Sequence, residues 1–351
     1  MSTLFSPRTL RGTTFRNRAW VSPMCQYSAQ DGMPDDWHLV HLGSRAVGGA
    51  GLVLTEATAV SPQGRISPQD TGIWNDEQVA AWARITAFVK AQGAVVGVQL
   101  AHAGRKASTH RPWDAASGTV RPDEGGWPAV GPSAVAFGRY AEPVALDLEG
   151  IATVRSDFLA ATARSAQAGF QVLELHAAHG YLLHNFLSPL SNTRTDSYGG
   201  CFDNRVRLLL EIAQDVRACW EGPLLVRISA SDWTEGGWSL EESVRLGGLL
   251  AERGVDLVDV SSGGLHHTQQ IAVAPGYQVP FAAAVRQAGI PTGAVGLITD
   301  ARQAEQVLVA GQADVVLLAR ELLRDPYWPL RAAAELGDEV AWPSQYERAA
   351  P

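Results

Sequence analysis

The stretch "VLELHAAHGYLLHNFLSPLSNTR" (172–194) opens as a buried β-strand and then places His176 and His179 three residues apart, with Tyr181 close behind. Its strand lacks polar/apolar alternation, which is typical of strands buried on both faces of a parallel sheet. The chain holds eight such runs, at 18–24, 51–57, 94–100, 171–176, 223–229, 256–262, 291–297 and 313–320.

Helical patterns separate these runs. Asn75 can cap a helix that Gly93 ends, and Ser239 with Glu242 forms a capping box before another helix. Eight strands alternating with helices in 351 residues predict an α/β fold, a single-domain (β/α)8 TIM barrel over residues 1–351. A doubly wound sheet is the alternative, but its usual GxGxxG motif after the first strand is missing. Further helical patterns lie at 156–169, 202–220 and 300–311.

The composition is that of an ordinary globular protein, with 46% hydrophobic residues and a net charge of -8. This charge does not suggest a nucleic-acid partner, which would favour a basic stripe. Three cysteines without a CxxC pair argue for a reducing compartment and against a disulfide framework. The N-terminus lacks a signal-peptide core, and no apolar run approaches the ~18 residues of a membrane span. We therefore expect a soluble cytoplasmic protein.

Residues 103–147 break the alternation, because they are rich in Gly, Pro, Trp and Arg and show no convincing helix or strand. A connection of this length is usually functional or disordered, and its aromatic content argues against disorder. It leaves the carboxyl end of the third strand, where barrel active sites lie. We interpret it as a lid or a substrate-facing insertion; a decorative insertion is the alternative.

Polar residues gather at the carboxyl ends of the predicted strands, which meet at one mouth of a barrel. Glycines such as Gly296, together with Arg320, follow the last strands and favour a phosphorylated ligand. Gln99 and Arg227 are polar residues within buried strands. Since a buried arginine needs a partner, Arg227 either pairs with Glu56 or Glu174 or faces an electron-rich cofactor ring.

The histidine pair allows three interpretations. A metal site would need a third ligand, and HExxH is absent. A structural corner is the second possibility. In the third, His176 and His179 are neutral imidazoles that donate hydrogen bonds to a carbonyl-like oxygen, and Tyr181 delivers a proton.

Long motifs along the whole chain resemble those of the Old Yellow Enzyme family, specifically its thermophilic-like subgroup. The resemblance implies a barrel that holds FMN non-covalently. NADPH would reduce flavin N5 by hydride transfer and leave, and an activated alkene such as an α,β-unsaturated ketone or aldehyde would then take hydride at its β-carbon and a proton at its α-carbon. The matching motifs are "SPMCQY" (22–27), "TEATAVSPQGRI" (55–66), "QLAHAGRKA" (99–107), "LELHAAHGYLLHNFLSPLSNTRTDSYGG" (173–200), "FDNRVRLLLE" (202–211), "LLARELLRDP" (317–326) and "QYER" (345–348).

The resemblance also implies a role for each matching residue. His176 and His179 would hold the substrate carbonyl oxygen, Tyr181 would donate the proton, and Tyr27 would contact the substrate. Lys106 could approach the flavin or the lid. Ala319 departs from the family's usual Gly-Arg pair at the phosphate. The implied flavin-binding residues are Ser22, Pro23 and Met24, Cys25 as a tuner of the flavin potential, Ala57, Gln99 at the pyrimidine edge, Arg227 at N1 and O2, Gly296, Ala319 and Arg320.

The C-terminal tail, 340–351, matches a segment whose arginine enters the neighbouring subunit's active site in the family. Here that residue would be Arg348, which implies a homodimer or homotetramer; a frayed, solvated tail is the alternative. Three other functions compete with an ene-reductase. They are a flavin-based redox sensor or nitro/quinone reductase, a relative of 2,4-dienoyl-CoA reductase, whose iron–sulfur cysteines and extra length are missing here, and a flavin-free barrel.

Overall fold

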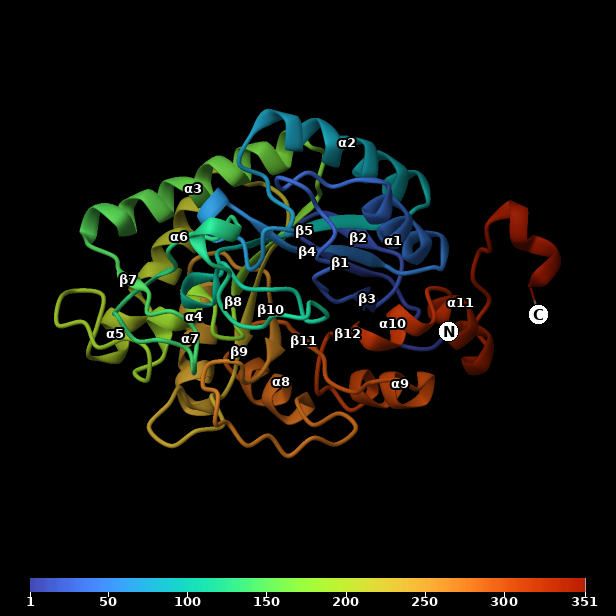
Figure 1. Cartoon of the computed structure of the whole chain (residues 1–351). Coiled ribbons are helices and arrows are strands. Elements are labelled where there is room, and N and C mark those ends of the chain that lie inside the picture. The colour runs from blue at the N-terminus through green and yellow to red at the C-terminus, as the bar shows by residue number, and fades with distance from the viewer. Residues whose placement is uncertain (351) are drawn as a thin grey trace.

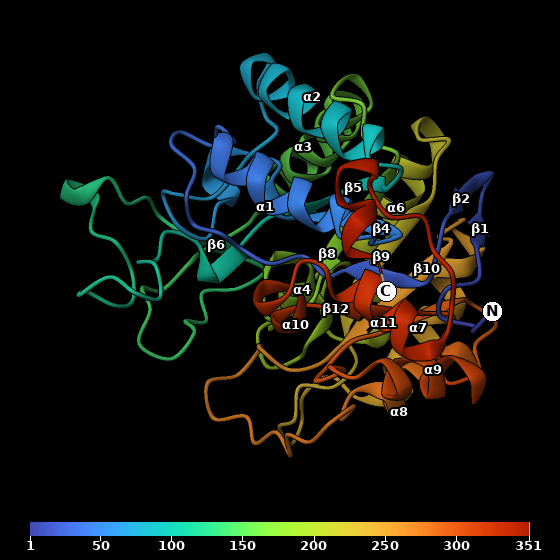
Figure 2. The same cartoon turned by 90° about the vertical axis from the view of Figure 1, so that its right-hand side faces the viewer.

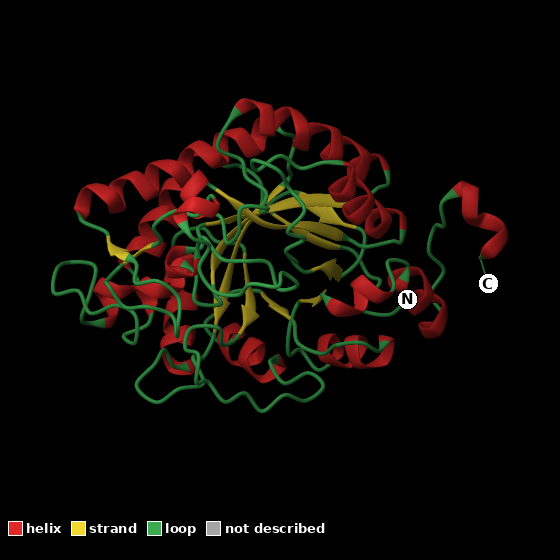
Figure 3. Ribbon diagram, viewed as in Figure 1, coloured by secondary structure: helices red, strands yellow, loops and turns green. Residues whose placement is uncertain are grey.

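The computed structural model describes residues 1–350, and its centre is a closed barrel of eight parallel strands surrounded by helices (Figure 3). This confirms the predicted (β/α)8 barrel, and each of the eight predicted runs supplies one strand. In the order in which they hydrogen-bond around the barrel, the strands are β10 (Leu257–Ser261), β11 (Thr292–Ala294), β12 (Val315–Leu318), β3 (Ala19–Val21), β4 (Leu52–Ala59), β5 (Val95–Ala101), β8 (Val172–Ala177) and β9 (Leu224–Ser229).

Eleven helices are assigned in residues 1–350, most of them wrapping the barrel (Figure 1). The Asn75 and Ser239 capping boxes both form, with Gln78 and Glu242 as their third residues. The helices are α1 (Asp36–Val47), α2 (Asp76–Ala91), α3 (Leu148–Gln167), α4 (Leu182–Leu187), α5 (Phe202–Arg205), α6 (Arg207–Cys219), α7 (Leu240–Glu252), α8 (Val279–Arg286), α9 (Ala301–Val309), α10 (Arg320–Arg324) and α11 (Trp328–Leu336).

A hairpin that the sequence analysis did not predict closes the amino-terminal end of the barrel. Its strands, β1 (Arg8–Leu10) and β2 (Thr13–Phe15), pair antiparallel. Leu10 and Phe15 join one buried apolar cluster with residues from the barrel strands, including Trp20 and Leu225. The amino-terminal end of the barrel is therefore filled by apolar side chains, and the carboxyl ends of the strands are where a barrel site is expected.

The 103–147 segment carries some secondary structure, so the expectation of none was wrong. It contains two short 3-10 helices, η2 (Gly104–Lys106) and η3 (Pro122–Glu124), and a minimal two-stranded sheet of β6 (Val130–Gly131) and β7 (Val144–Ala145). Elements of two or three residues leave no periodicity that a sequence can show. Figure 2 shows the segment, in teal and green, extending from the same side of the barrel as the orange loop after β10.

The C-terminal tail extends away from the barrel in Figure 1, where it is red. Its one regular element is the 3-10 helix η4 (Ser344–Ala349), whose residues are all exposed. Pro351, the last residue of the predicted tail, lies outside the described residues. Within residues 1–350, no helix has the length and apolar character needed to cross a membrane.

Candidate active site

Three side chains predicted to act together do lie together at the end of β8. The ring centroid of His176 is 5.2 Å from that of His179 and 4.9 Å from that of Tyr181, in edge-to-face arrangements. The backbone achieves this by turning sharply after the strand, since His179 and Gly180 both have left-handed φ angles, 58° and 73°. This turn brings the second imidazole and the phenol back toward the first imidazole.

Both imidazoles are held neutral. Burial, followed by the charge of Arg227, lowers the pKa of His176 and of His179 well below the ordinary value. His176 Nδ1 accepts from the Ala178 N–H at 3.3 Å, so its proton is on Nε2. His179 Nε2 lies 2.7 Å from Ser261 Oγ. Each neutral imidazole carries one N–H, so each ring can donate a hydrogen bond to an oxygen without carrying a positive charge.

Tyr181 and Cys25 both keep their protons. Burial raises the pKa of Tyr181 well above its ordinary value, and nearby Cys25 and Tyr27 act in the same direction. Burial also raises the pKa of the Cys25 thiol, with help from the carboxylates of Asp70 and Glu56. Cys25 is therefore a neutral thiol in the wall of the site and a poor nucleophile.

A cavity of about 350 Å³ connects this group with the 103–147 segment. Tyr27 and Tyr181 line it from the barrel side, and Lys106, Phe137, Tyr140 and most of residues 109–118 line it from the segment. Tyr27 also meets the segment directly, through an edge-to-face contact with Trp113 at 5.6 Å between ring centroids. The predicted substrate-contacting tyrosines and the long segment thus share one cavity.

The interior of the barrel below this site is polar. In the parallel register, Gln99 lies opposite Glu174, and Arg227 lies opposite His176 on one side and Asp259 on the other. Gln99 Nε2 donates to Glu174 Oε1 at 2.7 Å. Burial, followed by the nearby Asp259 carboxylate, raises the pKa of Glu174 to about 8.

The partner of Arg227 differs from both acids suggested by the sequence. Its Nε lies 3.2 Å from Asp259 Oδ2, and its Nη1 donates to Ser22 Oγ at 3.0 Å. Glu56 instead lies 3.1 Å from His38 Nε2 and accepts from the Gln26 N–H at 3.0 Å. Glu56 therefore binds the backbone next to Cys25, and Asp259 is the acid that pairs with Arg227.

A second cavity, of about 170 Å³, lies at the ends of β9 to β12. Arg227, Gly296, Ala319 and Arg320 all line it, which brings four of the predicted cofactor residues together. Gly296 has a φ of 120°, and a Cβ there would lie 2.8 Å from Gln278 Nε2, so only glycine leaves this wall open. An arginine beside an open glycine wall suits an anionic group.

Of the remaining predicted residues, four lie near Cys25 and one, Arg348, lies away from the site. Ala57 belongs to a small buried cluster against which Cys25, Tyr27 and Tyr181 pack. Ser22 is buried, and Pro23 and Met24 are half-buried in the segment that leads to Cys25. Arg348 is exposed in the protruding tail and does not join the site of its own chain.

Sequence reasoning missed two supporting side chains, Asp259 and Ser229, and named Lys106 without its contacts. Asp259 is a polar residue in a buried strand, the same pattern that identified Gln99, and so could have been found. Lys106 was named without a partner, and its Nζ donates to the backbone oxygen of His179 at 2.8 Å. Ser229 Oγ accepts from the His179 N–H at 2.9 Å, but a serine at a strand end carries no distinctive pattern.

Across the described residues, no group of three or more His, Cys, Asp or Glu side chains could hold a metal ion.

Comparisons with known proteins identify the family and the fold of the chain. Residues 3–339 match a family described as NADH:flavin oxidoreductase / NADH oxidase. The chain is 48% identical over 349 residues to the NADPH dehydrogenase of Bacillus subtilis (strain 168), covering 98% of each chain. A solved morphinone reductase has a TM-score of 0.80 at 28% identity, covering 98% of this chain and 92% of that one. A 2-naphthoyl-CoA reductase complex, at 24% identity and a TM-score of 0.85, shares the fold over 96% of this chain, which spans 52% of that longer protein.

Proposed function

This chain belongs to the NADH:flavin oxidoreductase / NADH oxidase family, and we infer from its site that it is an FMN-dependent NADPH dehydrogenase that reduces activated alkenes. The membership confirms the predicted Old Yellow Enzyme family, while the thermophilic-like subgroup stays a prediction. When bound, FMN supplies the two-electron carrier between NADPH and the alkene. The observation that carries the proposal is the neutral His176–His179 pair with the protonated Tyr181 beside it.

The residues at the mouth of the barrel fit a flavin mononucleotide. Arg227 is a buried cation that can face an electron-rich ring, and Asp259 compensates its charge from the other side. Gln99 donates its amide hydrogen to Glu174, which leaves the amide oxygen to accept from a ring N–H. Gly296, Ala319 and Arg320 line the second cavity and would hold the phosphate. We assign Ser22, Pro23, Met24, Cys25 and Ala57 to the wall along the ring.

His176 and His179 would bind and orient the substrate through its carbonyl oxygen. The His176 Nε2–H is free to donate, because Nδ1 already accepts from the backbone. Negative charge grows on that oxygen during alkene reduction, and fixed neutral donors stabilise it without reorganising. Tyr181 would then transfer its phenolic proton to the α-carbon, a role that its raised pKa supports because the proton stays in place until a strong base forms.

Cys25 and Tyr27 would complete the site from the β3 side. The protonated Cys25 thiol would tune the flavin potential without covalent chemistry. Tyr27 shares the 350 Å³ cavity with Tyr181 and would contact the substrate. The 103–147 segment forms the other wall of that cavity, so we assign it as the substrate-side lid. Enones and related activated alkenes are the substrates we propose.

We further propose that Arg348 acts in a neighbouring subunit of a homodimer or homotetramer. Its exposed position in a tail that extends away from the barrel supports this role, since the tail does not serve its own site. Three free cysteines at positions 25, 201 and 219 support a cytoplasmic location, where thiols stay reduced.

The first experiment is a visible spectrum of the purified protein, followed by titration with p-hydroxybenzaldehyde in air. Flavin absorption bands and a new long-wavelength charge-transfer band are expected, because the phenolate would stack on the flavin while the histidine pair holds its oxygen. Flavin bands without the new band would contradict the histidine assignment. A colourless protein that stays colourless with added FMN would contradict the flavoenzyme itself. Steady oxidation of NADPH with cyclohexenone separates an ene-reductase from a redox sensor.

A further inference from the structure

In the turn that carries His179 and Tyr181, the backbone N–H and C=O groups of His179 and Gly180 are each hydrogen-bonded to a side chain. His179 and Gly180 are consecutive left-handed residues, a conformation that glycine adopts readily and that is uncommon for a residue with a side chain such as histidine. The His179 N–H donates to Ser229 Oγ at 2.9 Å, and its carbonyl accepts from Lys106 Nζ at 2.8 Å. The Gly180 carbonyl accepts from Asn185 Nδ2 at 2.8 Å. One backbone group of the turn remains, the Gly180 N–H.

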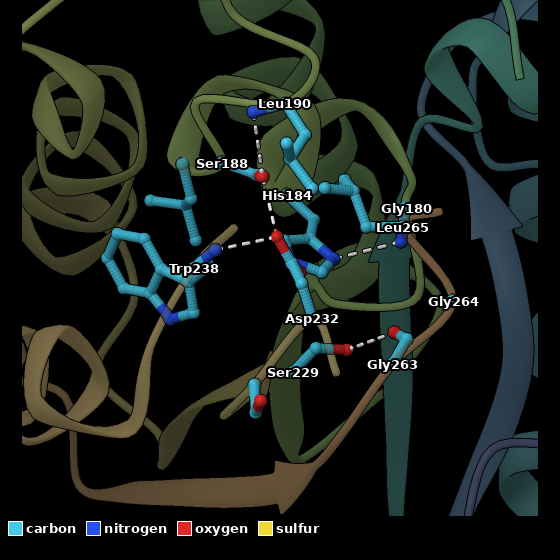
Figure 4. A network of polar contacts seen from close by, with 12 residues as sticks. Gly180, His184, Ser188, Leu190, Ser229, Asp232, Trp238, Gly263, Gly264 and Leu265 are labelled. Carbon is cyan, nitrogen blue, oxygen red and sulfur yellow. Dashed lines mark hydrogen bonds and ion pairs between the residues drawn. The ribbon is translucent and has the colours of Figure 1, made fainter. Parts of the chain in front are cut away.

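His184 satisfies this last group. Its Nδ1 accepts from the Gly180 N–H at 2.9 Å, and its Nε2 lies 2.9 Å from Asp232 Oδ1 (Figure 4). Because Nδ1 is an acceptor, the ring proton is on Nε2, the nitrogen that lies at ion-pair distance from the carboxylate. Both side chains are fully buried, with 0% of either exposed. The hydrogen bond at Nδ1 fixes the tautomer of the buried ring, and the carboxylate beside Nε2 favours the same orientation.

Asp232 is itself fixed, because it accepts from two further donors. Ser188 Oγ donates to Asp232 Oδ2 at 2.6 Å, and the Trp238 N–H donates to the same oxygen at 2.7 Å. Burial alone would raise the pKa of Asp232, but His184 and these donors outweigh it and hold the pKa below the ordinary value. The carboxylate follows β9, so the pair ties the end of that strand to the first turn of α4.

We propose that Asp232 and His184 form a positioning pair that sets the His179–Tyr181 turn for proton donation and carbonyl binding. Neither side chain lines the two cavities of the site, so the pair acts only through the turn. Tyr181 follows Gly180 directly and is the N-cap of α4, and His184 reaches back from the first turn of the same helix. This inference rests on the proposed function, which assigns the proton donor to Tyr181.

Two matched variants separate the two bonds of His184. In His184→Asn the amide oxygen can take the place of Nδ1 and accept from Gly180. In His184→Gln the amide nitrogen can take the place of Nε2 and donate to Asp232, while Gly180 loses its acceptor. If both retain FMN and thermal stability, we expect His184→Gln to slow reoxidation of the reduced flavin by cyclohexenone at least tenfold. Flavin reduction by NADPH should change less than twofold, and His184→Asn should lie closer to the parent.

A Tyr181→Phe background tests whether the pair acts through the phenol. We expect His184→Gln to add less than a twofold further loss once Tyr181 is gone, because the positioned group is missing. An equal loss in both backgrounds, with the charge-transfer binding of p-hydroxybenzaldehyde at His179 unchanged, would mean general damage and would overturn the proposal.

A failure of the proposed function gives a different result. If Tyr181→Phe alone changes neither half-reaction, Tyr181 is not the proton donor, and the pair is then judged by binding of p-hydroxybenzaldehyde at His179. In that case, weaker charge-transfer binding in His184→Gln than in His184→Asn supports the pair, and equal binding overturns it.

Discussion

At the scale of single residues, Arg227 shows how a buried charge depends on its partners. It lies between Asp259 and Ser22, and the carboxyl group of Glu174 lies in the same barrel interior. We expect Arg227→Met to lower the free energy of unfolding by about 3–5 kcal/mol, because it leaves a buried carboxylate without its cation. Denaturant unfolding of the FMN-free protein measures this.

The matched control adds Asp259→Asn to Arg227→Met. Removing the uncompensated charge should restore part of the lost stability, since a neutral amide costs less to bury than an unpaired carboxylate. A double variant that is less stable than Arg227→Met alone would show that the loss comes from packing around the methionine.

His102 gives a pH dependence with a defined sign. Burial lowers its pKa to about 4, whereas an unfolded histidine titrates near 6.5. Below about pH 6.5 the unfolded chain binds a proton that the folded protein does not, so stability is full above that pH and falls toward pH 4. Between pH 7 and pH 5 the expected loss is about 2 kcal/mol.

The measurement compares denaturant unfolding of the parent and of His102→Asn at both pH values. The asparagine oxygen can replace Nδ1 as the acceptor for the Gly104 N–H, which lies 3.1 Å away. His41, whose pKa burial lowers to about 3, contributes equally to both proteins and cancels in the comparison. The same acid-induced loss in parent and variant would remove His102 as its source.

At the scale of elements, the sequence predicted the strands and helices whose burial pattern or capping residues are visible in a short segment. The eight strands were found because a strand covered on both faces has few polar residues, and α2 and α7 were found through their capping boxes. The β1–β2 hairpin was not predicted, because Arg11 occupies a left-handed turn position, with a φ of 41°. An asparagine or glycine at that position is the usual sequence signal for such a turn. Arg11 Nε instead lies 2.9 Å from Asp256 Oδ1, a contact between distant segments that no local pattern reveals.

The turn between β8 and α4 leads to a prediction about glycine. Gly180 has a φ of 73°, and an added Cβ would overlap the carbonyl oxygen of Gly264. We expect Gly180→Ala to lower stability by more than the about 1–3 kcal/mol of backbone strain alone and to abolish phenol binding. Gly200→Ala is the control, because Gly200 has a φ of 81° but nothing within 4 Å of an added Cβ.

The two variants thus differ mainly in steric overlap. Thermal unfolding and the charge-transfer titration read the two effects separately. Equal destabilisation by Gly180→Ala and Gly200→Ala would show that the approach of Gly264 does not constrain the turn.

At the scale of the whole molecule, the sequence predicted the members of the site better than their partners. Strand ends of a barrel converge whatever the loops do, so Cys25, Gln99, His176 and Arg320 could be placed at one mouth from the fold alone. Which acid faces Arg227 depends on the register between β9 and β10. That register results from packing of the entire barrel and is absent from any short segment.

Arg348 lies exposed in the protruding tail, so the proposal that it acts in a neighbouring subunit can be tested by mixing variants. We expect Arg348→Ala and Tyr181→Phe each to have low activity alone. Mixed under conditions that exchange subunits, they should form hybrids in which one site combines Tyr181 of the first variant with Arg348 of the second. Activity should therefore recover on mixing, as NADPH oxidation with cyclohexenone would measure.

The control for this experiment mixes Tyr181→Phe with His176→Ala. In this mixture His176 and Tyr181 of any one site come from the same chain. Every site of a hybrid therefore lacks one of the two residues, and activity should stay low. If Arg348 acted within its own chain, its mixture with Tyr181→Phe would behave like this control. Recovery in the first mixture alone is the result that places the arginine in the neighbouring active site.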